Sequence, residues 1–126
     1  MESLSALMLA GSLWAFTVPS FPAHVQRDVI QFGSPIPAAE MLGTGFVDGI
    51  QGEDLSYSGW AGAFDLDAPA DGATLVVITF NAGYCEVYMA RHSSGRRISG
   101  VTKFLDPSCA QPLVKRPYHF NARKVG

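Results

Sequence analysis

The strongest constraint on the fold of this chain is the run of β-branched and apolar residues from Thr74 to Phe80. Residues of these types favour extended backbone, so the run predicts a central strand. Asn81-Ala82-Gly83 follows, and Gly83 can adopt the left-handed conformation that a short hairpin loop needs. The next segment, Tyr84–Met89, alternates in polarity and predicts the returning strand. This alternation assigns Cys85, Val87 and Met89 to the core face and Tyr84, Glu86 and Tyr88 to the other face.

Turn-forming residues divide the rest of the chain into further short elements. Ser34 suits a helix N-cap and Pro35 the first helical position, so we expect one helix that begins there and ends by Gly49. Strands are expected from residue type over 27–32, 55–64 and 96–104, with an edge strand over 118–120. Together these elements predict a small α+β domain, in which one short helix packs on an antiparallel β-meander of about four to five strands.

Cys85 and Cys109 are the only cysteines of the chain. If the hairpin after Met89 turns near Ser94, Cys85 lies opposite Thr102, close enough for Cys109 to reach it within the Cα separation of about 6 Å that a disulfide needs. We therefore expect one disulfide, which stabilises the fold by about 3–4 kcal/mol. The alternative is a pair of buried thiols in a cytosolic protein. No histidine stands at ligand spacing from either cysteine, so we expect no metal site.

The opening segment carries no charge from Ser3 to Ala23. Its apolar part has the length of a secretory h-region, about 7–15 residues, and falls short of the about 20 residues of a membrane span. We therefore expect a signal-peptide-like apolar segment over 1–20 and no permanent membrane span. The chain begins Met1-Glu2, without the basic residues of a signal peptide, so a buried helix of the mature fold and a membrane anchor stay open as alternatives.

This reading leaves residues 21–126 as a single α+β domain, with a secreted or periplasmic location. The location agrees with the expected disulfide, because disulfides persist in oxidising compartments.

Charge is unevenly distributed along the chain. Residues 1–75 contain nine acids against Arg27 alone, a net of −8, and residues 76–126 contain eight bases against two acids, a net of +6. The asymmetry indicates an anionic partner for the second half, or two halves whose fields partly cancel when folded together. The candidate binding face consists of Tyr84, Tyr88, Arg91, Arg96, Arg97 and Lys103. Its alternative is a solvated turn whose cations protect a strand edge.

No motif of the chain assigns a catalytic residue or a cofactor. His24, His92 and His119 stand far apart, and the sequence contains no phosphate-binding loop and no dinucleotide fingerprint. Asp65, Asp67 and Asp71 lack EF-hand spacing and are interpreted as a solvated turn. A hydrolase that uses such carboxylates stays open, because the geometry of a carboxylate pair depends on the fold and not on spacing.

The sequence therefore predicts a small exported, non-enzymatic binding or accessory protein of the cell envelope or of a secreted complex. Its partner is expected to be another protein or an anionic surface ligand, and nucleic acid is not expected, since no recognition motif for it occurs. Two alternatives remain: a subunit of a larger membrane-associated assembly that retains its N-terminal apolar helix, and a carboxylate-dependent hydrolase.

Overall fold

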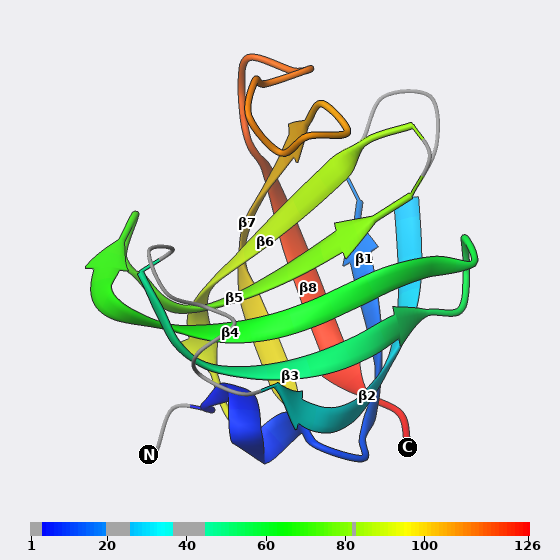
Figure 1. The fold of residues 1–126 in the computed structure, drawn as a ribbon, viewed down its shortest axis with the longest axis vertical. Helices are drawn as coiled ribbons and strands as arrows, with labels where there is room; N and C mark the ends of the chain where they lie inside the picture. The colour runs from blue at the N-terminus through cyan, green and yellow to red at the C-terminus, as the bar shows by residue number, and fades with distance from the viewer. Residues whose placement is uncertain (1–3, 20–25, 37–44, 82) are drawn as a thin grey trace.

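The structure, a computed structural model, describes residues 4–19, 26–36, 45–81 and 83–126. In these residues eight antiparallel strands follow one another in chain order and close into a barrel (Figure 1). A short 3-10 helix, η1, precedes the first strand. The elements are η1 (Ala6–Leu9), β1 (Leu13–Val18), β2 (Gln26–Ile36), β3 (Phe46–Asp54), β4 (Gly59–Ala70), β5 (Ala73–Phe80), β6 (Cys85–Ser93), β7 (Arg97–Leu105) and β8 (Tyr118–Lys124). The predicted α+β fold is therefore wrong.

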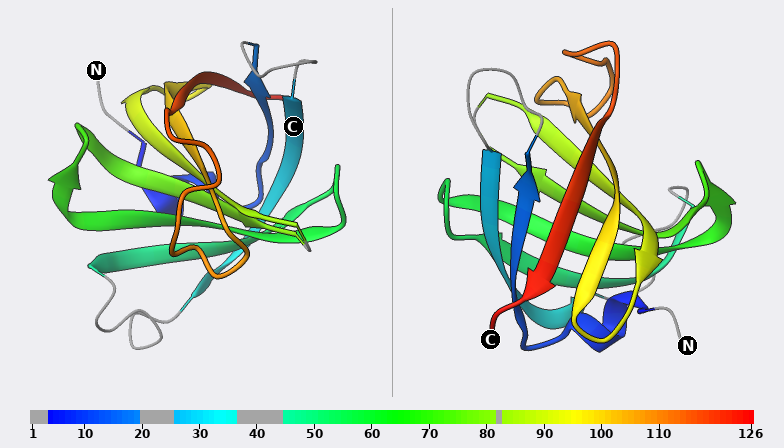
Figure 2. Two further views of the ribbon diagram at one scale, coloured as in Figure 1. Left: turned by 90° about the horizontal axis from the view of Figure 1, so that it is seen from above. Right: turned by 180° about the vertical axis from the view of Figure 1, so that it is seen from behind.

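The barrel is closed by the pairing of β1 with β8. Trp14 lies opposite Lys124 and Thr17 opposite Asn121, and the N–H of Val125 donates to the carbonyl oxygen of Leu13 at 2.8 Å. Figure 2 shows the two strands side by side from behind. The segment predicted as an edge strand thus pairs on both sides. Closure satisfies the backbone groups that an open sheet would leave unpaired at its edges.

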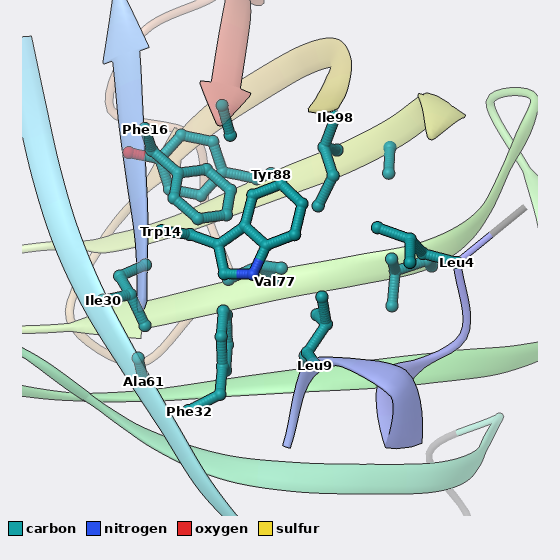
Figure 3. Packing of buried hydrophobic residues seen from close by; sticks show 14 of the residues in the cluster. Leu4, Leu9, Trp14, Phe16, Ile30, Phe32, Ala61, Val77, Tyr88 and Ile98 are labelled. Atoms are coloured by element: carbon teal, nitrogen blue, oxygen red, sulfur yellow. The ribbon is translucent and has the colours of Figure 1, made fainter. Parts of the chain in front are cut away.

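The apolar opening segment forms part of the barrel. Trp14, Phe16 and Val18 of β1 are buried in the interior, and Leu4 and Leu9 of the η1 region cover one end (Figure 3). The segment therefore belongs to the fold as a 3-10 turn and a strand, and not as the buried helix of the sequence-based alternative. The described residues contain no helix long and apolar enough to cross a bilayer.

Two backbone–side-chain hydrogen bonds fix η1 against the barrel end. The N–H of Ala6 donates to Oδ1 of Asp65 at 2.9 Å, and the N–H of Leu4 donates to Oγ of Ser93, also at 2.9 Å. The bond of Ala6 satisfies a donor that a short helix leaves unpaired at its N-terminus, and the bond of Leu4 holds the segment just before the helix. The apolar residues of the segment are thereby held over the interior, and this end of the barrel is closed.

Aromatic side chains fill the interior next to η1. The ring centroids of Phe16 and Tyr88 lie 4.6 Å apart, those of Tyr88 and Phe120 4.9 Å, and Trp14 Nε1 donates to Ser12 Oγ at 2.8 Å. The indole nitrogen is therefore satisfied although Trp14 is fully buried. Barrels of eight strands are just narrow enough for side chains to fill them, and this half of the barrel is filled.

The predicted hairpin is confirmed, because Phe80 pairs with Cys85 across the loop of residues 81–84, of which Ala82 lies outside the described residues. The predicted faces are wrong. Glu86 and Tyr88 are fully buried in the interior, whereas Met89 packs in a second apolar cluster with Val76, Val101 and Phe64. Both faces of β6 are apolar enough to be buried, so alternation alone does not identify the inner one.

The predicted helix does not begin where its capping signals stand. Ser34 and Pro35 belong to β2, at an irregularity of the β2–β3 pairing between Phe32 and Pro35, where a proline is tolerated. Residues 37–44 lie outside the described residues. The strand predicted over 55–64 begins later, because residues 55–58 form the turn between β3 and β4.

Candidate functional site

The disulfide between Cys85 and Cys109 is confirmed, with 5.3 Å between the Cα atoms. Its predicted register is wrong by three residues, because Cys85 lies opposite Leu105 and not Thr102. The hairpin turns later than predicted, with Ser93 opposite Ile98, which shifts the register by four residues, and the irregularity in β6 after Ala90 reduces this shift to three. The bridge ties the β7–β8 connection to the start of β6, at the barrel end opposite η1 (Figure 1).

The structure separates the residues of the predicted binding face. Tyr88 is fully buried in the barrel. Arg91 and Lys103 meet at Asp71, where Lys103 Nζ lies 2.5 Å from Oδ2 and Arg91 Nε donates to the carbonyl oxygen at 2.9 Å. Tyr84 lies elsewhere, against Phe104, with 5.7 Å between ring centroids. The remaining two residues, Arg96 and Arg97, line a surface hollow together with Arg123 and Lys124.

Three carboxyl side chains converge in the interior at the end opposite η1. Asp28 of β2, Asp54 of β3 and Glu86 of β6 are each 2% exposed or less. We call them the carboxyl cluster. Tyr88 donates its hydroxyl to Oδ2 of Asp28, and Thr102 Oγ1 donates to Oε2 of Glu86 at 2.6 Å. The interior therefore changes from apolar near η1 to acidic at the opposite end.

Two members of the carboxyl cluster, Asp28 and Asp54, have raised pKa values. Burial raises the pKa of Asp28 to about 6, and the charge of Glu86 adds to the shift. Burial raises the pKa of Asp54 to about 7, with a further contribution from its hydrogen bond to Asp28. A hydrogen bond between two carboxyl groups requires a proton on one of them. Asp28 and Asp54 thus form a pair that shares a proton close to neutral pH.

Aromatic side chains surround this end of the barrel. The ring centroid of Phe104 lies 5.7 Å from that of Tyr84 and 6.0 Å from that of Tyr118, and Tyr57 lies in the β3–β4 turn with 43% of its surface exposed. We call these four residues the aromatic rim. Burial raises the pKa of Tyr84 to about 12, with the charge of Glu86 as the next cause. Tyr84 therefore stays neutral beside the carboxyl cluster.

Burial and the charges of Asp28 and Asp54 also raise the pKa of Tyr57, so the exposed end of the rim is electrostatically coupled to the cluster. Negative charge beneath aromatic rings is an arrangement that favours a cationic ligand, because both the carboxylates and the ring faces attract positive charge. The hydroxyls of the tyrosines add neutral hydrogen-bond donors and acceptors.

Sequence reasoning missed the carboxyl cluster. A readable signal existed in β2, because Asp28 alternates with Ile30 and Phe32 and so shares their face. The alternation of residues 84–89 assigns Glu86 to the face away from the core, where acids are usually found. The pairing of β2 with β3, in which Ile30 lies opposite Asp54, brings Asp54 beside Asp28, and only Glu86 of β6 meets them across the closed barrel.

The acids that the sequence analysis considered are dispersed. Asp65 accepts the N–H of Ala6, and Asp71 pairs with Lys103. His92 and His119 are exposed on separate strands, and His24 lies outside the described residues. Within the described ranges, no three His, Cys, Asp or Glu side chains are arranged to hold a metal ion. Comparisons with protein-family models, with curated proteins and with solved structures find no match for this chain.

Proposed function

We propose that the protein is a small exported binding protein that holds a small, amine-bearing ligand at the carboxyl cluster. The observation that carries the proposal is the convergence of Asp28, Asp54 and Glu86 inside a barrel that is otherwise filled with apolar side chains. Burial of acids costs free energy, and groups with strongly raised pKa values concentrate at functional sites.

The architecture supports a binding role for this end. Eight-stranded barrels are wide enough to hold one small ligand at a mouth, and η1 covers the opposite end here. A protonated amine placed among the carboxylates would stabilise their ionised forms. The aromatic rim would contact its apolar part and add cation–π attraction of about 0.5–2 kcal/mol.

The disulfide supports export, because it is compatible with an oxidising compartment. In this proposal residues 4–18 remain in the exported protein, since η1 and β1 are parts of the closed barrel.

The proposal is tested with benzylamine and butylamine, each compared with its neutral alcohol analogue, benzyl alcohol and butanol. Calorimetric titration at pH 8 should detect the amines and not the alcohols, because only the amines carry positive charge. Glu86→Gln should weaken amine binding. Glu53→Gln is the matched control, because Glu53 lies on β3 next to Asp54 but is exposed. Equal binding of amines and alcohols, or no effect of Glu86→Gln, would contradict the proposal.

The hydrogen-bonded pair of Asp28 and Asp54 favours a second candidate, a carboxylate-dependent hydrolase. Their pKa values of about 6 and about 7 lie where a general acid or base works best near neutral pH. In this hydrolase candidate Asp28 and Asp54 take the place of Asp65 and Asp67, the acids that the sequence suggested. A panel of chromogenic glycosides and esters tests it, with loss of turnover expected in Asp54→Asn and none in Glu53→Gln. Turnover that survives Asp54→Asn would exclude it.

A further inference from the structure

A group of arginines lies on the outer wall of the barrel, where β7, β8, β1 and β2 are neighbours. Arg97 pairs with Arg123 across β7 and β8, and Arg123 pairs with Ala15 of β1. On the other side of β1, Thr17 pairs with Arg27 of β2. The three arginine side chains therefore surround a stretch of β1 that bears small side chains. All three are exposed.

Two adjoining hollows follow from this arrangement. One, of about 410 Å³, is lined by Arg27, Arg97 and Arg123 together with Ala15 and Thr17. The other, of about 500 Å³, is lined by five residues, Arg96, Arg97, Arg123, Lys124 and Val125. The hollows share Arg97, Arg123 and Val125, so they form one continuous surface. We call it the arginine groove and count Arg27, Arg96, Arg97, Arg123 and Lys124 as its cations.

The groove concentrates positive charge in a protein whose formal net charge is −2. No carboxylate is among the described residues that line it. The ion pair found among the described residues, Lys103 with Asp71, involves none of its cations. Like charges held this close repel one another, and a cleft lined by one sign of charge attracts a ligand of the opposite sign.

We propose that the arginine groove binds a linear anionic polysaccharide through its sulfate or carboxylate groups. Arginine suits this ligand, because its planar guanidinium donates two parallel hydrogen bonds to such groups. The continuity of the two hollows through Arg97 and Arg123 fits a chain with repeated charges better than a single ion. The site lies on the outside of the barrel, so it is independent of the carboxyl cluster within.

Other polyanions fit the groove less well. Single-stranded nucleic acid is held by aromatic side chains on which bases stack, and the described lining of the groove contains no aromatic residue. Docking on a lipid surface relies on large exposed apolar side chains beside the cations. The largest purely apolar side chain among the described lining residues is a valine.

The probe is a heparin octasaccharide, with polygalacturonate as the carboxylate form. We expect salt-sensitive binding of the intact protein, and a Kd about tenfold or more weaker in the double variant Arg97→Gln/Arg123→Gln. Arg27→Gln alone should weaken binding less. The matched control is Lys115→Gln/Arg116→Gln, which removes two exposed cations from the β7–β8 connection. Circular dichroism and the Tm of each variant verify that it is folded.

Two competitors distinguish the sources of negative charge: a thymidine oligonucleotide of matched charge, and vesicles of phosphatidylglycerol. Displacement of the labelled octasaccharide by polygalacturonate and not by these competitors supports the proposal. Tighter binding of the oligonucleotide or the vesicles would overturn it. An unchanged Kd in either groove variant would also overturn it. An equal loss of affinity in the Lys115→Gln/Arg116→Gln control would do the same.

Discussion

The hydroxyl of Tyr88 donates a hydrogen bond to Oδ2 of Asp28, a residue 60 positions earlier in the chain. The ring of Tyr88 packs against both Phe16 and Phe120, so the same side chain contacts the apolar half of the interior and the carboxyl cluster. Burial and the charge of Glu86 raise the pKa of Tyr88 well above its usual value, which keeps the phenol protonated. Tyr88 is therefore a permanent donor to the cluster.

Tyr88→Phe should destabilise the protein more at pH 8 than at pH 5. At pH 8 Asp28 is ionised, because its pKa is about 6, and loss of its donor costs about 1–3 kcal/mol. At pH 5 Asp28 is protonated, and loss of the Tyr88 hydroxyl then costs less free energy because the carboxyl group is neutral. Urea unfolding at both pH values measures the difference, with Tyr57→Phe as the control for an exposed hydroxyl. Equal losses at the two pH values would count against the role of this hydrogen bond.

Asp54→Asn should flatten the dependence of stability on pH. Folding raises the pKa of Asp54 from 3.8 to about 7, so the folded state binds the proton more tightly than the unfolded state. The free energy of unfolding then falls as pH rises from about 4 to about 7. Asparagine cannot ionise, so the variant should be more stable than the wild type at pH 8, by about 1–2 kcal/mol, and similar to it at pH 4. Urea titrations across this range test the prediction, and parallel pH profiles would refute it.

The double variant Cys85→Ser/Cys109→Ser should lose about 3–4 kcal/mol of stability, because the bridge closes a loop with a sequence separation of 24. Reduction of the wild type should produce a comparable loss. Both are measured by urea unfolding. If the reduced wild type and the variant unfold at the same urea concentration as the oxidised protein, the bridge does not restrain the unfolded chain.

Leu9→Ala should destabilise the barrel by about 2–5 kcal/mol, since Leu9 is fully buried where η1 closes the interior. Leu7→Ala is the matched control in the same helix, because Leu7 is 48% exposed, and its effect should be small. Thermal unfolding of the two variants gives the comparison. A Leu9 variant as stable as the Leu7 variant would show that η1 does not contribute to the core.

The intact mass of the protein from its own source tests whether the opening segment is retained. The proposed function requires a mass that includes residues 4–18 and that increases by two hydrogens on reduction of the disulfide. Loss of the first twenty residues would remove η1 and β1 and leave β2 and β8 without a shared neighbour. A mature chain shortened in this way would contradict the proposal that the exported form is the closed barrel.

Local patterns predicted the local parts of the fold. The run 74–80 with Gly83 and the following strand, the strand near 96–104 and the disulfide all depend on residues that are near one another in the chain. Closure of the barrel does not depend on neighbouring residues. The pairing of Trp14 with Lys124 joins distant parts of the sequence and leaves no local pattern. The opening segment was interpreted from its lack of charge, and that property suits a buried barrel strand equally well.

The site was harder to predict for the same reason. Asp28 reveals its inward position through the alternation of β2, and the pairing of β2 with β3 places Asp54 beside it. Glu86 lies on β6 and meets the two aspartates only across the interior of the closed barrel. The capping pair Ser34-Pro35 was misleading, because proline fits an irregular strand pairing as well as a helix start. A helix was therefore predicted where the structure continues β2.

Because the first and the last of the eight strands are neighbours, the pairing that closes the barrel is the one that waits longest during synthesis. While β2 to β7 can pair with their predecessors as they are made, β1 keeps one free edge until residues 118–124 are available. The other pairings join consecutive strands, so the closing pair is the one whose contacts are distant in the chain, and such contacts form slowly. Until β8 pairs with β1 the sheet is open, and the outer edge of β1 exposes backbone groups that the closed barrel satisfies.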